Sequence, residues 1–552
     1  MTMKMKKLGL FALAVLVVVL LFTLVGGRGN DGASVPAFST VKVNNPAAQR
    51  KSQLTVTCPA YSGNFNPLYL ADETDQAATR LVFDPLVEPS ADGTPTPVLA
   101  QFEISPDGKI YTFTLEKNAS FSDGTPVTAQ DIAFTWHVLY DPAYDGHLLT
   151  SRPALAGSDA YTAGTASSIY GIEILDNRTI RATLDAPDAS ALFTLGVAPL
   201  SKAYYGTNYT PGHLDTLLLQ LSRPMGCGQY ALTELTMEQL TFERCKGYYR
   251  GAPSYESVLF VVADPDKAAS MLLDGTSDLD LTGGSRQIQT NDYDYLVSRV
   301  YAGDSLGLLG FSLKTKELTD PAARKAIALC VDRQALIDLA LPNQAVPHTA
   351  PVSLGSWAGS GVPSAGIAGP AAAAALLEQN GYAKNTSGVY QKNGVPLQVV
   401  YTVTKNNPVS EALAAQLSEN LPKAGIRLTV RSADYATLLN QIEVGKAELW
   451  FMAYGAPFDP DPSPLLATGG AFNFFGYSNS VVDSLLQLAL QQQDSTRRAD
   501  LYSQIWTALD NDPPFVVLYQ REARAVCNIR CQDLAFNAVR PVTADFYLLK
   551  TK

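Results

Sequence analysis

The sequence predicts an α/β protein built from two or three lobes. Its 552 residues exceed what one ordinary hydrophobic core holds. From about residue 263 onward, segments of helical periodicity alternate with short apolar runs, which is typical of a lobe with an open sheet. Before about residue 262, strand patterns dominate and helices are few, which indicates a mixed sheet region.

The composition narrows the classes of function. Hydrophobic residues make up 46% of the chain and charged residues 17%, which indicates a globular protein. The formal net charge of −11 argues against nucleic acid as a partner, because a phosphate-binding surface needs a basic excess. The acidic balance is otherwise compatible with an ordinary solvated surface or with attraction of cationic solutes.

The N-terminus predicts export. Three lysines precede an unbroken apolar run, Leu8–Val25, so residues 1–25 read as a membrane anchor or a signal, with the lysines kept in the cytoplasm. We expect an uncleaved anchor that tethers the protein to the outer face of the cytoplasmic membrane, because no Ala-x-Ala site follows; a cleaved, secreted or periplasmic form is the alternative. No cysteine precedes Cys58, so the lipoprotein pattern is absent. Residues 26–50 predict a flexible tether.

Six cysteines in an exported chain predict one or two disulfides rather than a disulfide scaffold. Cys227 and Cys245 flank a predicted hairpin, and folding that hairpin brings them near one another. Cys527 and Cys531 form a second candidate pair. The remaining two cysteines, Cys58 in a strand and Cys330 on a helix, read as inert buried thiols.

No metal site or cofactor is predicted. None of the cysteines and histidines is grouped with the spacing of a zinc site. The histidines are scattered along the chain: His137, His147, His213 and His348.

The stretch FSDGTPVTAQDIAFTW predicts a strand end, a tight turn and a capped helix. The preceding IYTFTL alternates as a half-buried strand does. Asp123-Gly124 supplies the turn, and Thr128 with Asp131 forms a capping box at the start of the helix. This stretch carries no catalytic group, so we expect it to serve packing.

Further signals place elements along the chain. Hairpins are predicted at 171–185 and 229–244. In the second half, Asp320 and Pro321 begin one helix, a second restarts at Asp332, and Gly381 ends a third. The last third then alternates strand and helix from PLQVVYTV to ELWFMAYG.

Several stretches, taken in order, carry a family resemblance. The longest is LVFDPLVEPSADGTPTPVLAQFEISPDGKIYTFTLEKNASFSDGTPVTAQDIAFTWHVLYDP, followed by RPMGCGQY, DPAARKAIALCVDRQALI, GYSNSVVDSLL and RADLYSQIWTALDNDPPFVVLY. Together they resemble the extracytoplasmic solute-binding proteins of ABC importers, in the oligopeptide- and dipeptide-binding class known as bacterial solute-binding protein family 5. The likeness runs from about residue 51 to 545. RPMGCGQY is similar to the family's Pro-x-Gly-x-Gly-Pro-Tyr loop, with Gln229 in place of the second proline.

The resemblance implies a two-lobed, periplasmic-binding-protein-like α/β fold of type II, cluster C, with an extra domain inserted in lobe I. Two strands would cross between the lobes, near Val261–Asp264 and Pro513–Val516, and act as a hinge. The implied parts are lobe I at 51–83, 168–262 and 515–552, the inserted subdomain at 84–167 and lobe II at 263–514.

The resemblance also implies a set of ligand contacts. The family's cleft has a Trp-Gly-x-Asp-Tyr-x-Asp-Pro stretch whose first aspartate pairs with the ligand's free amine. Here Tyr454 falls at the tryptophan and Pro457 at that aspartate, so the amine clamp is missing from its usual place. Asp459 or Asp461 could substitute, although a turn before proline is the favoured interpretation of both. The expected ligand-binding residues are Asn64, Phe65, Asn66, Gly228, Gln229, Tyr230, Phe311, Ser312, Tyr454, Phe458, Asp459 and Asn473.

Three functions follow as hypotheses. The first is a monomeric, membrane-tethered receptor that captures a peptide or similar solute by lobe closure and delivers it to an ABC permease. The second keeps the fold but binds a nickel chelate, haem, an oligosaccharide or a peptide signal. The third, an exported hydrolase, is disfavoured because the chain has no Gly-x-Ser-x-Gly elbow, His-Glu-x-x-His or phosphate-binding loop. We therefore do not expect an enzyme.

Overall fold

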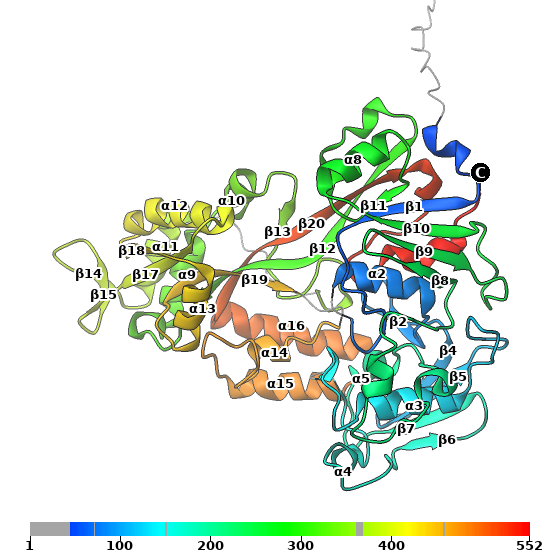
Figure 1. Cartoon of the computed structure of the whole chain (residues 1–552). Coiled ribbons are helices and arrows are strands. Elements are labelled where there is room, and N and C mark those ends of the chain that lie inside the picture. Colours follow the sequence, from blue (N-terminus) through cyan, green and yellow to red (C-terminus); the bar gives the residue numbers. More distant parts are fainter. Residues whose placement is uncertain (1–44, 71, 150–151, 360–367, 456–458, 552) are drawn as a thin grey trace, which may run out of the picture. The chain divides into compact units, whose positions relative to one another are not determined.

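The computed structural model describes residues 45–70, 72–149, 152–359, 368–455 and 459–551 (Figure 1). The predicted anchor, residues 1–25, and most of the predicted tether lie outside these ranges. In the described part of the chain, no helix combines the length and the apolar character needed to cross a bilayer. The tether prediction is wrong for residues 45–50. Asn45 exchanges two side-chain hydrogen bonds with Asn528, of 2.7 and 2.9 Å, and the 3-10 turn Pro46–Gln49 buries Ala47.

One large mixed sheet of eleven strands connects most of the described chain. A short strand, β13 (Ala345–Pro347), pairs beside β20. The other strands run in this order: β18 (Arg427–Ala433), β17 (Gln398–Thr404), β19 (Leu449–Gly455), β12 (Leu296–Phe311), β20 (Phe515–Asn528), β11 (Leu279–Asp280), β1 (Gln53–Cys58), β10 (Ser257–Val262), β9 (Gln239–Arg244) and β8 (Tyr230–Leu235). Strands that follow one another in the sequence are thus often far apart in the sheet.

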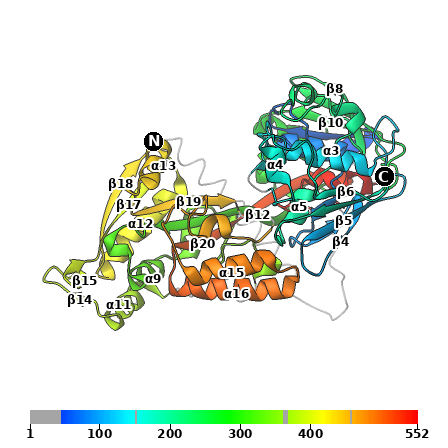
Figure 2. The same cartoon turned by 90° about the horizontal axis from the view of Figure 1, so that it is seen from below.

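Two long strands pass between the two ends of this sheet. β12 pairs with β20 along almost its whole length; it starts opposite Asn528 near β11 and ends opposite β19. Figure 2 shows both strands running between the two lobes. We call the part around β1, β8–β11 and the inserted segment the first lobe, and the part around β17–β19 the second lobe. The two-lobed α/β fold predicted from the sequence is confirmed.

The place of the crossing differs from the prediction near Val261–Asp264. After β10 the chain forms α8 (Pro265–Leu273) and then β11, which pairs in parallel with β1 and so stays in the first lobe. The chain crosses only later, within β12. On the other crossing strand, Phe515 is still paired with Gly310 in the second lobe, so the first lobe does not begin at residue 515.

The inserted segment forms its own four-stranded antiparallel sheet. The order is β4 (Ala100–Ile104), β5 (Ile110–Leu115), β7 (Thr179–Thr183) and β6 (Ile172–Ile174), and a hairpin of β2 (Val87–Pro89) and β3 (Pro95–Pro97) precedes it. The predicted end of this segment at residue 167 is therefore too early. The hairpin at 171–185 forms as predicted, but β7 pairs with β5 and so belongs to the inserted sheet.

The turn and helix around FSDGTPVTAQD have the predicted packing role. The Asp123 carboxylate accepts the Thr125 N–H at 2.9 Å, which closes the turn. Helix α3 (Ala129–Leu139) starts after Thr128, whose backbone N–H donates to the Asp131 carboxylate at 2.8 Å. The second oxygen of Asp131 accepts the Lys202 N–H, also at 2.8 Å. The capping box thus also fastens a neighbouring loop.

Helices cover the sheets at the positions that their caps predict. Asp320 accepts the Ala322 N–H at the start of one helix, with Pro321 first, and Asp332 accepts the Ala335 N–H at the next. The longer helices are α2 (Glu73–Val82), α9 (Pro321–Leu329), α10 (Arg333–Ala340), α11 (Gly369–Gln379), α12 (Pro408–Lys423), α13 (Tyr435–Glu443), α15 (Ser480–Gln491) and α16 (Ser495–Asn511). The short ones are α4 (Ser158–Thr162), α5 (Ala191–Leu195), α6 (Lys202–Tyr205), α7 (Asp215–Leu218) and α14 (Ser463–Leu466). A small sheet of β14 (Ala383–Lys384), β15 (Tyr390–Lys392) and β16 (Val395–Pro396) lies beyond α11.

The hydrophobic core divides by lobe. One continuous cluster joins Leu54 of β1, Phe113 and Trp136 of the inserted segment and Tyr230 of β8. The inserted segment therefore shares the core of the first lobe. The second lobe has two clusters, one on each face of its sheet, because alternate residues of β12 point to opposite faces: Leu309 lies in one cluster and Leu308 in the other.

The second lobe also contacts the inserted segment directly. The Ala189 N–H donates to the Leu490 carbonyl at 2.6 Å, and Gln493 Nε2 lies 3.3 Å from the Tyr111 hydroxyl. The last turn of α15, with Leu490, and the turn that follows it, with Gln493, make these contacts. The two lobes thus meet here as well as along β12 and β20.

Candidate functional site

In the first lobe, the topology places a candidate site beyond the carboxyl ends of three parallel strands. In the sheet, β1 lies between β10 and β11 and is parallel to both. The connections between these strands therefore run to opposite sides of β1. Ligands of α/β proteins bind at such a switch point, outside the carboxyl ends of the strands. Here these ends are Cys58, Val262 and Asp280.

The second lobe offers a matching arrangement. β17 is parallel to β18 on one side and to β19 on the other, and these strands end at Thr404, Ala433 and Gly455. Gly455 pairs with Ser305 of β12, so this end of the second lobe lies against the crossing strands. We call the described residues that follow the six strand ends, up to the first residue of the next helix, together with residues 301–305 of β12, the strand-end site.

The crossing strands are irregular at this site. Ala302 pairs with Glu522 and Leu306 with Gln520, so that Gly303, Asp304 and Ser305 lie opposite Arg521 alone. The bulge turns the Asp304 side chain out to solvent. Gln520 is buried beside it: its amide donates to the Gly303 carbonyl, and its side-chain oxygen accepts the Leu354 N–H. The side chain of Gln520 therefore fixes the shape of the bulge.

An acidic group lies at the first-lobe side of the bulge. Tyr301 stacks on Phe536 with ring centroids 6.1 Å apart. Burial is the main cause that raises the pKa of Tyr301; Arg286 lowers it, and the negative charges of Glu73 and Asp304 raise it further. Glu73, the first residue of α2, and Asp304 are exposed and have no hydrogen-bond or ion-pair partner among the residues that the structure describes. Two uncommitted carboxylates thus lie within electrostatic reach of one tyrosine hydroxyl.

A buried ion pair fixes Asp459, where the described chain resumes after β19. Both carboxylate oxygens of Asp459 contact Arg498, at 3.0 and 2.8 Å, and Asp459 also accepts the Asp461 N–H at 3.0 Å. The Asp461 carboxylate accepts the Ser463 N–H and hydroxyl, and burial raises its pKa. The turn interpretation of both aspartates is confirmed, and the structure commits Asp459 to Arg498.

The comparisons with known proteins place this geometry in a family. A model of the family described as bacterial extracellular solute-binding proteins, family 5 Middle, matches residues 94–475 of the chain. The chain belongs to this family. It is thus a family 5 solute-binding protein, and the description of that family names solute binding as its role.

Relatives and solved structures agree over nearly the whole length. Heme-binding protein A of Haemophilus influenzae is 24% identical over 88% of this chain and 90% of its own. The oligopeptide-binding protein AppA of Bacillus subtilis is 22% identical over 94% of both chains. The structure of HbpA2 from Haemophilus parasuis matches with a TM-score of 0.73 and 21% identity, covering 91% of this chain and 100% of that one.

In this family 5 solute-binding protein, the predicted ligand-binding residues after β1 stabilise the loop to which they belong. Asn64 is half-buried and donates to the Tyr69 carbonyl. Phe65 belongs to the core, and Asn66 is buried with its side-chain oxygen accepting the Leu68 N–H at 2.9 Å. The loop follows β1 and so belongs to the strand-end site, but Phe65 and Asn66 are used for packing.

The glycine loop before β8 packs against α2 instead of facing a ligand. The Gly228 N–H donates to the Val82 carbonyl at 2.7 Å. Gln229 is fully buried and donates to the carbonyls of Thr543 and Ala544. Tyr230 is fully buried as well. The structure thus places these three predicted contacts inside the first lobe, because the loop must join α2 to the C-terminal segment.

This close packing gives a stability prediction for Gly228. A Cβ atom there would lie 2.5 Å from the carbonyl carbon of Val82, so Gly228→Ala should lower the free energy of unfolding by about 1–3 kcal/mol. Urea unfolding followed by circular dichroism measures the change. Gly247→Ala is the matched control, because a Cβ there has nothing within 4 Å. Unchanged stability in Gly228→Ala would contradict the packing role.

The remaining predicted ligand-binding residues lie in different environments. Phe311 and Ser312 are buried in the second lobe. Asn473 donates to the carbonyls of Ala467 and Tyr477, both at 2.8 Å, and so fixes a loop. Phe458 lies outside the described residues. Tyr454 is buried, and its ring lies 6.4 Å from that of Phe472 in an edge-to-face arrangement.

The predicted disulfides are wrong in this structure, where all six cysteines are free thiols. The hairpin forms as predicted, but the Cys245 N–H donates to the Gln229 carbonyl, so Cys245 lies opposite Gln229 rather than Cys227. The Cys227 thiol donates to the Asp84 carbonyl, and burial raises its pKa to about 12. Cys527 lies within β20, whereas Cys531 is the last residue of the 3-10 turn that follows, Ile529–Cys531.

Among the described residues, no group of three His, Cys, Asp or Glu side chains is arranged to hold a metal ion. His137 packs edge-to-face on Tyr161, and His348 lies 2.6 Å from the Val352 carbonyl. Both have a pKa lowered mainly by burial.

Sequence reasoning missed four residues at or beside the strand-end site: the exposed Glu73, Asp304 and Phe472, and the half-buried Tyr301. One signal pointed to Glu73, since Asp72 caps the helix that follows the β1 loop. Asp304 lies in an Ala-Gly-Asp stretch that reads as a turn, and nothing in the sequence places it within electrostatic reach of Tyr301 together with Glu73. Phe472, 48% exposed, stands next to Tyr454 through tertiary contacts alone.

Proposed function

We propose that this protein is the extracytoplasmic solute-binding component of an ABC importer, and that its solute is a peptide with a free amino group. The observation that carries the proposal is the pair of exposed carboxylates without described partners, Glu73 at the start of α2 and Asp304 in the bulge of β12, which both act electrostatically on Tyr301. A cationic amine forms charge-assisted hydrogen bonds with such carboxylates. They take the role of the clamp aspartate that Pro457 replaces.

The lobes would close on the peptide by bending at β12 and β20. The bulge at Gly303–Ser305 interrupts the ladder between these strands, so bending there disturbs few hydrogen bonds. A ligand favours the closed form only as far as it contacts both lobes. Gly455, which ends β19 in the second lobe, pairs with Ser305 in the bulge, next to Asp304 in the chain.

The proposal includes partners and a location. The protein acts as a monomer on the outer face of the cytoplasmic membrane, with residues 1–25 as its anchor, and it delivers its solute to an ABC permease. It carries out no chemistry on the solute. The names of relatives support solute capture, and an oligopeptide-binding protein is among them.

Peptide binding can be tested on the full-length protein with a tripeptide library and the same library N-acetylated. Free-amine peptides should raise the melting temperature, because a ligand of the folded state stabilises it. Acetylation should weaken binding about ten- to hundredfold, as expected for losing a charge-assisted hydrogen bond. In Asp304→Asn and Glu73→Gln this preference should shrink.

Glu411→Gln is the matched control, because Glu411 is likewise an exposed acidic residue in the first turn of a helix, here α12 of the second lobe. It should keep the full preference for free amines. If no peptide raises the melting temperature, or if acetylated peptides bind equally well, the proposed amine recognition is wrong.

A second candidate is a haem-binding protein of the same fold. It is favoured by one observation, the 24% identity over most of its length to heme-binding protein A of Haemophilus influenzae. Titration with haem, followed by its Soret absorbance, separates the two: tight haem binding without any peptide response would replace the first proposal.

A further inference from the structure

A cavity of about 420 Å³ lies within the second lobe. The cavity lies where the chain leaves the edge of β20. β13 pairs with Tyr519–Arg521, and the His348 N–H still donates to the Leu518 carbonyl at 3.4 Å. The next residues, Thr349 to Pro351, diverge from the strand and line the far wall. The cavity is half open to solvent and is lined by residues of α9, α10, α11, α16 and the start of β20, none of which belongs to the strand-end site.

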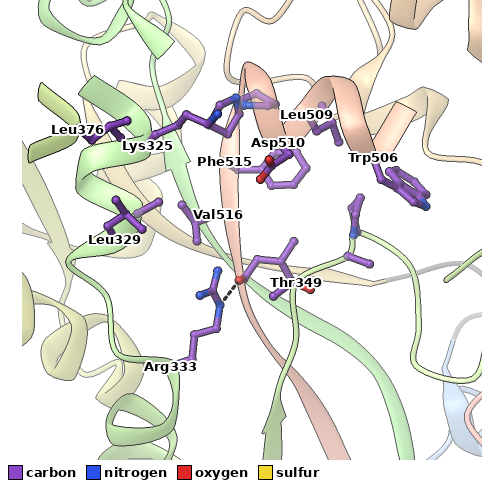
Figure 3. A pocket seen from close by; sticks show the side chains of 16 residues that line it. Lys325, Leu329, Arg333, Thr349, Leu376, Trp506, Leu509, Asp510, Phe515 and Val516 are labelled. Carbon is purple, nitrogen blue, oxygen red and sulfur yellow. Dashed lines mark hydrogen bonds between the residues drawn. The ribbon is translucent and has the colours of Figure 1, made fainter. Parts of the chain in front are cut away.

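The walls of the cavity are mostly apolar (Figure 3). They are formed chiefly by Leu329, Leu376, Trp506, Leu509, Phe515 and Val516. Trp506 is fixed because its indole N–H donates to the Ala358 carbonyl at 3.0 Å. An apolar cavity of this size with a few convergent polar groups is the usual form of a small-molecule site.

The polar group that matters is Arg333, the first residue of α10. Its Nε donates to the Val517 carbonyl at 2.8 Å, and Figure 3 shows the guanidinium directed into the space between the walls. Its two terminal nitrogens have no hydrogen-bond partner, and it forms no ion pair, among the residues that the structure describes. Burial lowers its pKa. Arg333 is therefore a half-buried cation without a counterion.

Other charged groups near the cavity leave Arg333 uncompensated. The adjacent Asp332 is occupied, since it accepts the Ala335 N–H at 3.0 Å as the cap of α10. Lys325 and Asp510 also line the cavity, with Asp510 exposed, and they form no ion pair with one another or with Arg333. In Figure 3 both lie on the side away from Arg333. Their opposite charges offset each other, so the net positive charge is that of Arg333.

We propose that this cavity binds a small monocarboxylate with an apolar body. The carboxylate would accept hydrogen bonds from the two free guanidinium nitrogens of Arg333, a geometry that arginine forms well with carboxylates. The apolar body would lie against Trp506 and Phe515. This second site is independent of the strand-end site and of the peptide proposed there.

Calorimetric titration of the full-length protein with octanoate and with 3-phenylpropionate tests the proposal. Each acid is paired with its own primary amide, which keeps the apolar body but removes the charge. The acids should bind, and the amides should bind about tenfold more weakly or worse. The two acids show whether the body is aliphatic or aromatic. If neither acid binds, or if amides and acids bind alike, the proposal is overturned.

Three variants locate the site. Arg333→Gln should weaken acid binding about tenfold and leave the already weak amides unchanged, since it removes the charge that distinguishes them. Asp510→Asn should strengthen acid binding, because it removes a negative charge from the lining. Ala328→Phe keeps Arg333 but fills cavity space, and it should abolish binding of the acids. If Arg333→Gln fails to fold, the other two variants still decide: acid binding unaffected by both would overturn the proposal.

Discussion

Replacing Asp278 by alanine is expected to lower the free energy of unfolding by about 3–5 kcal/mol. Asp278 is fully buried beside β11 and accepts hydrogen bonds from Arg50 at 2.6 Å, from Arg530 at 2.8 Å and from the Thr55 N–H at 2.8 Å. The substitution leaves two largely buried guanidinium groups without their shared carboxylate. Because Arg50 precedes β1 and Arg530 follows β20, both ends of the first lobe are loosened together.

Urea unfolding of the Asp278→Ala protein measures this loss. The control is Glu419→Ala, which breaks an ion pair with Lys423 whose side chains are both more than half exposed. That pair should contribute about 1 kcal/mol or less. Equal effects of the two substitutions would show that the buried network around Asp278 adds no stability.

Asp459→Ala is the second substitution with a large expected effect, again about 3–5 kcal/mol of unfolding free energy. It leaves Arg498 buried without a partner, although the guanidinium still lies over the rings of Trp357 and Tyr502 at 5.5 and 5.4 Å. It also removes the acceptor for the Asp461 N–H, which shapes the loop after β19.

This substitution separates a structural aspartate from an amine clamp. The measurement combines thermal unfolding with peptide titration at a temperature where the variant is folded. We expect a large fall in melting temperature and an unchanged preference for free-amine over acetylated peptides. Asp459→Asn should fall between the variant and the parent, because it keeps an acceptor for Asp461 but loses the charge. A lost amine preference with unchanged stability would assign Asp459 to the ligand.

Local signals in the sequence were sufficient for many single elements. Asp320, Pro321 and Asp332 cap their helices as predicted, because a helix N-terminus is decided by a few adjacent residues. The strand and turn before α3 follow for the same reason. The aspartates before Pro460 and Pro462 also form the turns that their local pattern favours.

Long-range pairing could not be predicted in the same way. β12 contains Ala302, Gly303 and Asp304 at its centre, a pattern that reads as a break, yet the strand continues because β20, about two hundred residues later, pairs with both halves. The register that sets Cys245 opposite Gln229 is equally a property of the whole sheet. The candidate site was the hardest part to predict, since Glu73 and Asp304 come within electrostatic reach of Tyr301 only through the long-range pairing of β12 and β20.

The position of β20 has a consequence for the order in which the protein is completed. This strand is among the last segments made, and it lies beside β12 and β11 at the centre of the sheet. A nascent chain that ends before Phe515 lacks the central partner of both lobes, so neither can close its core while synthesis continues. Such late, distant pairing slows folding. If the chain is exported as we propose, this delay keeps it unfolded for longer before it crosses the membrane.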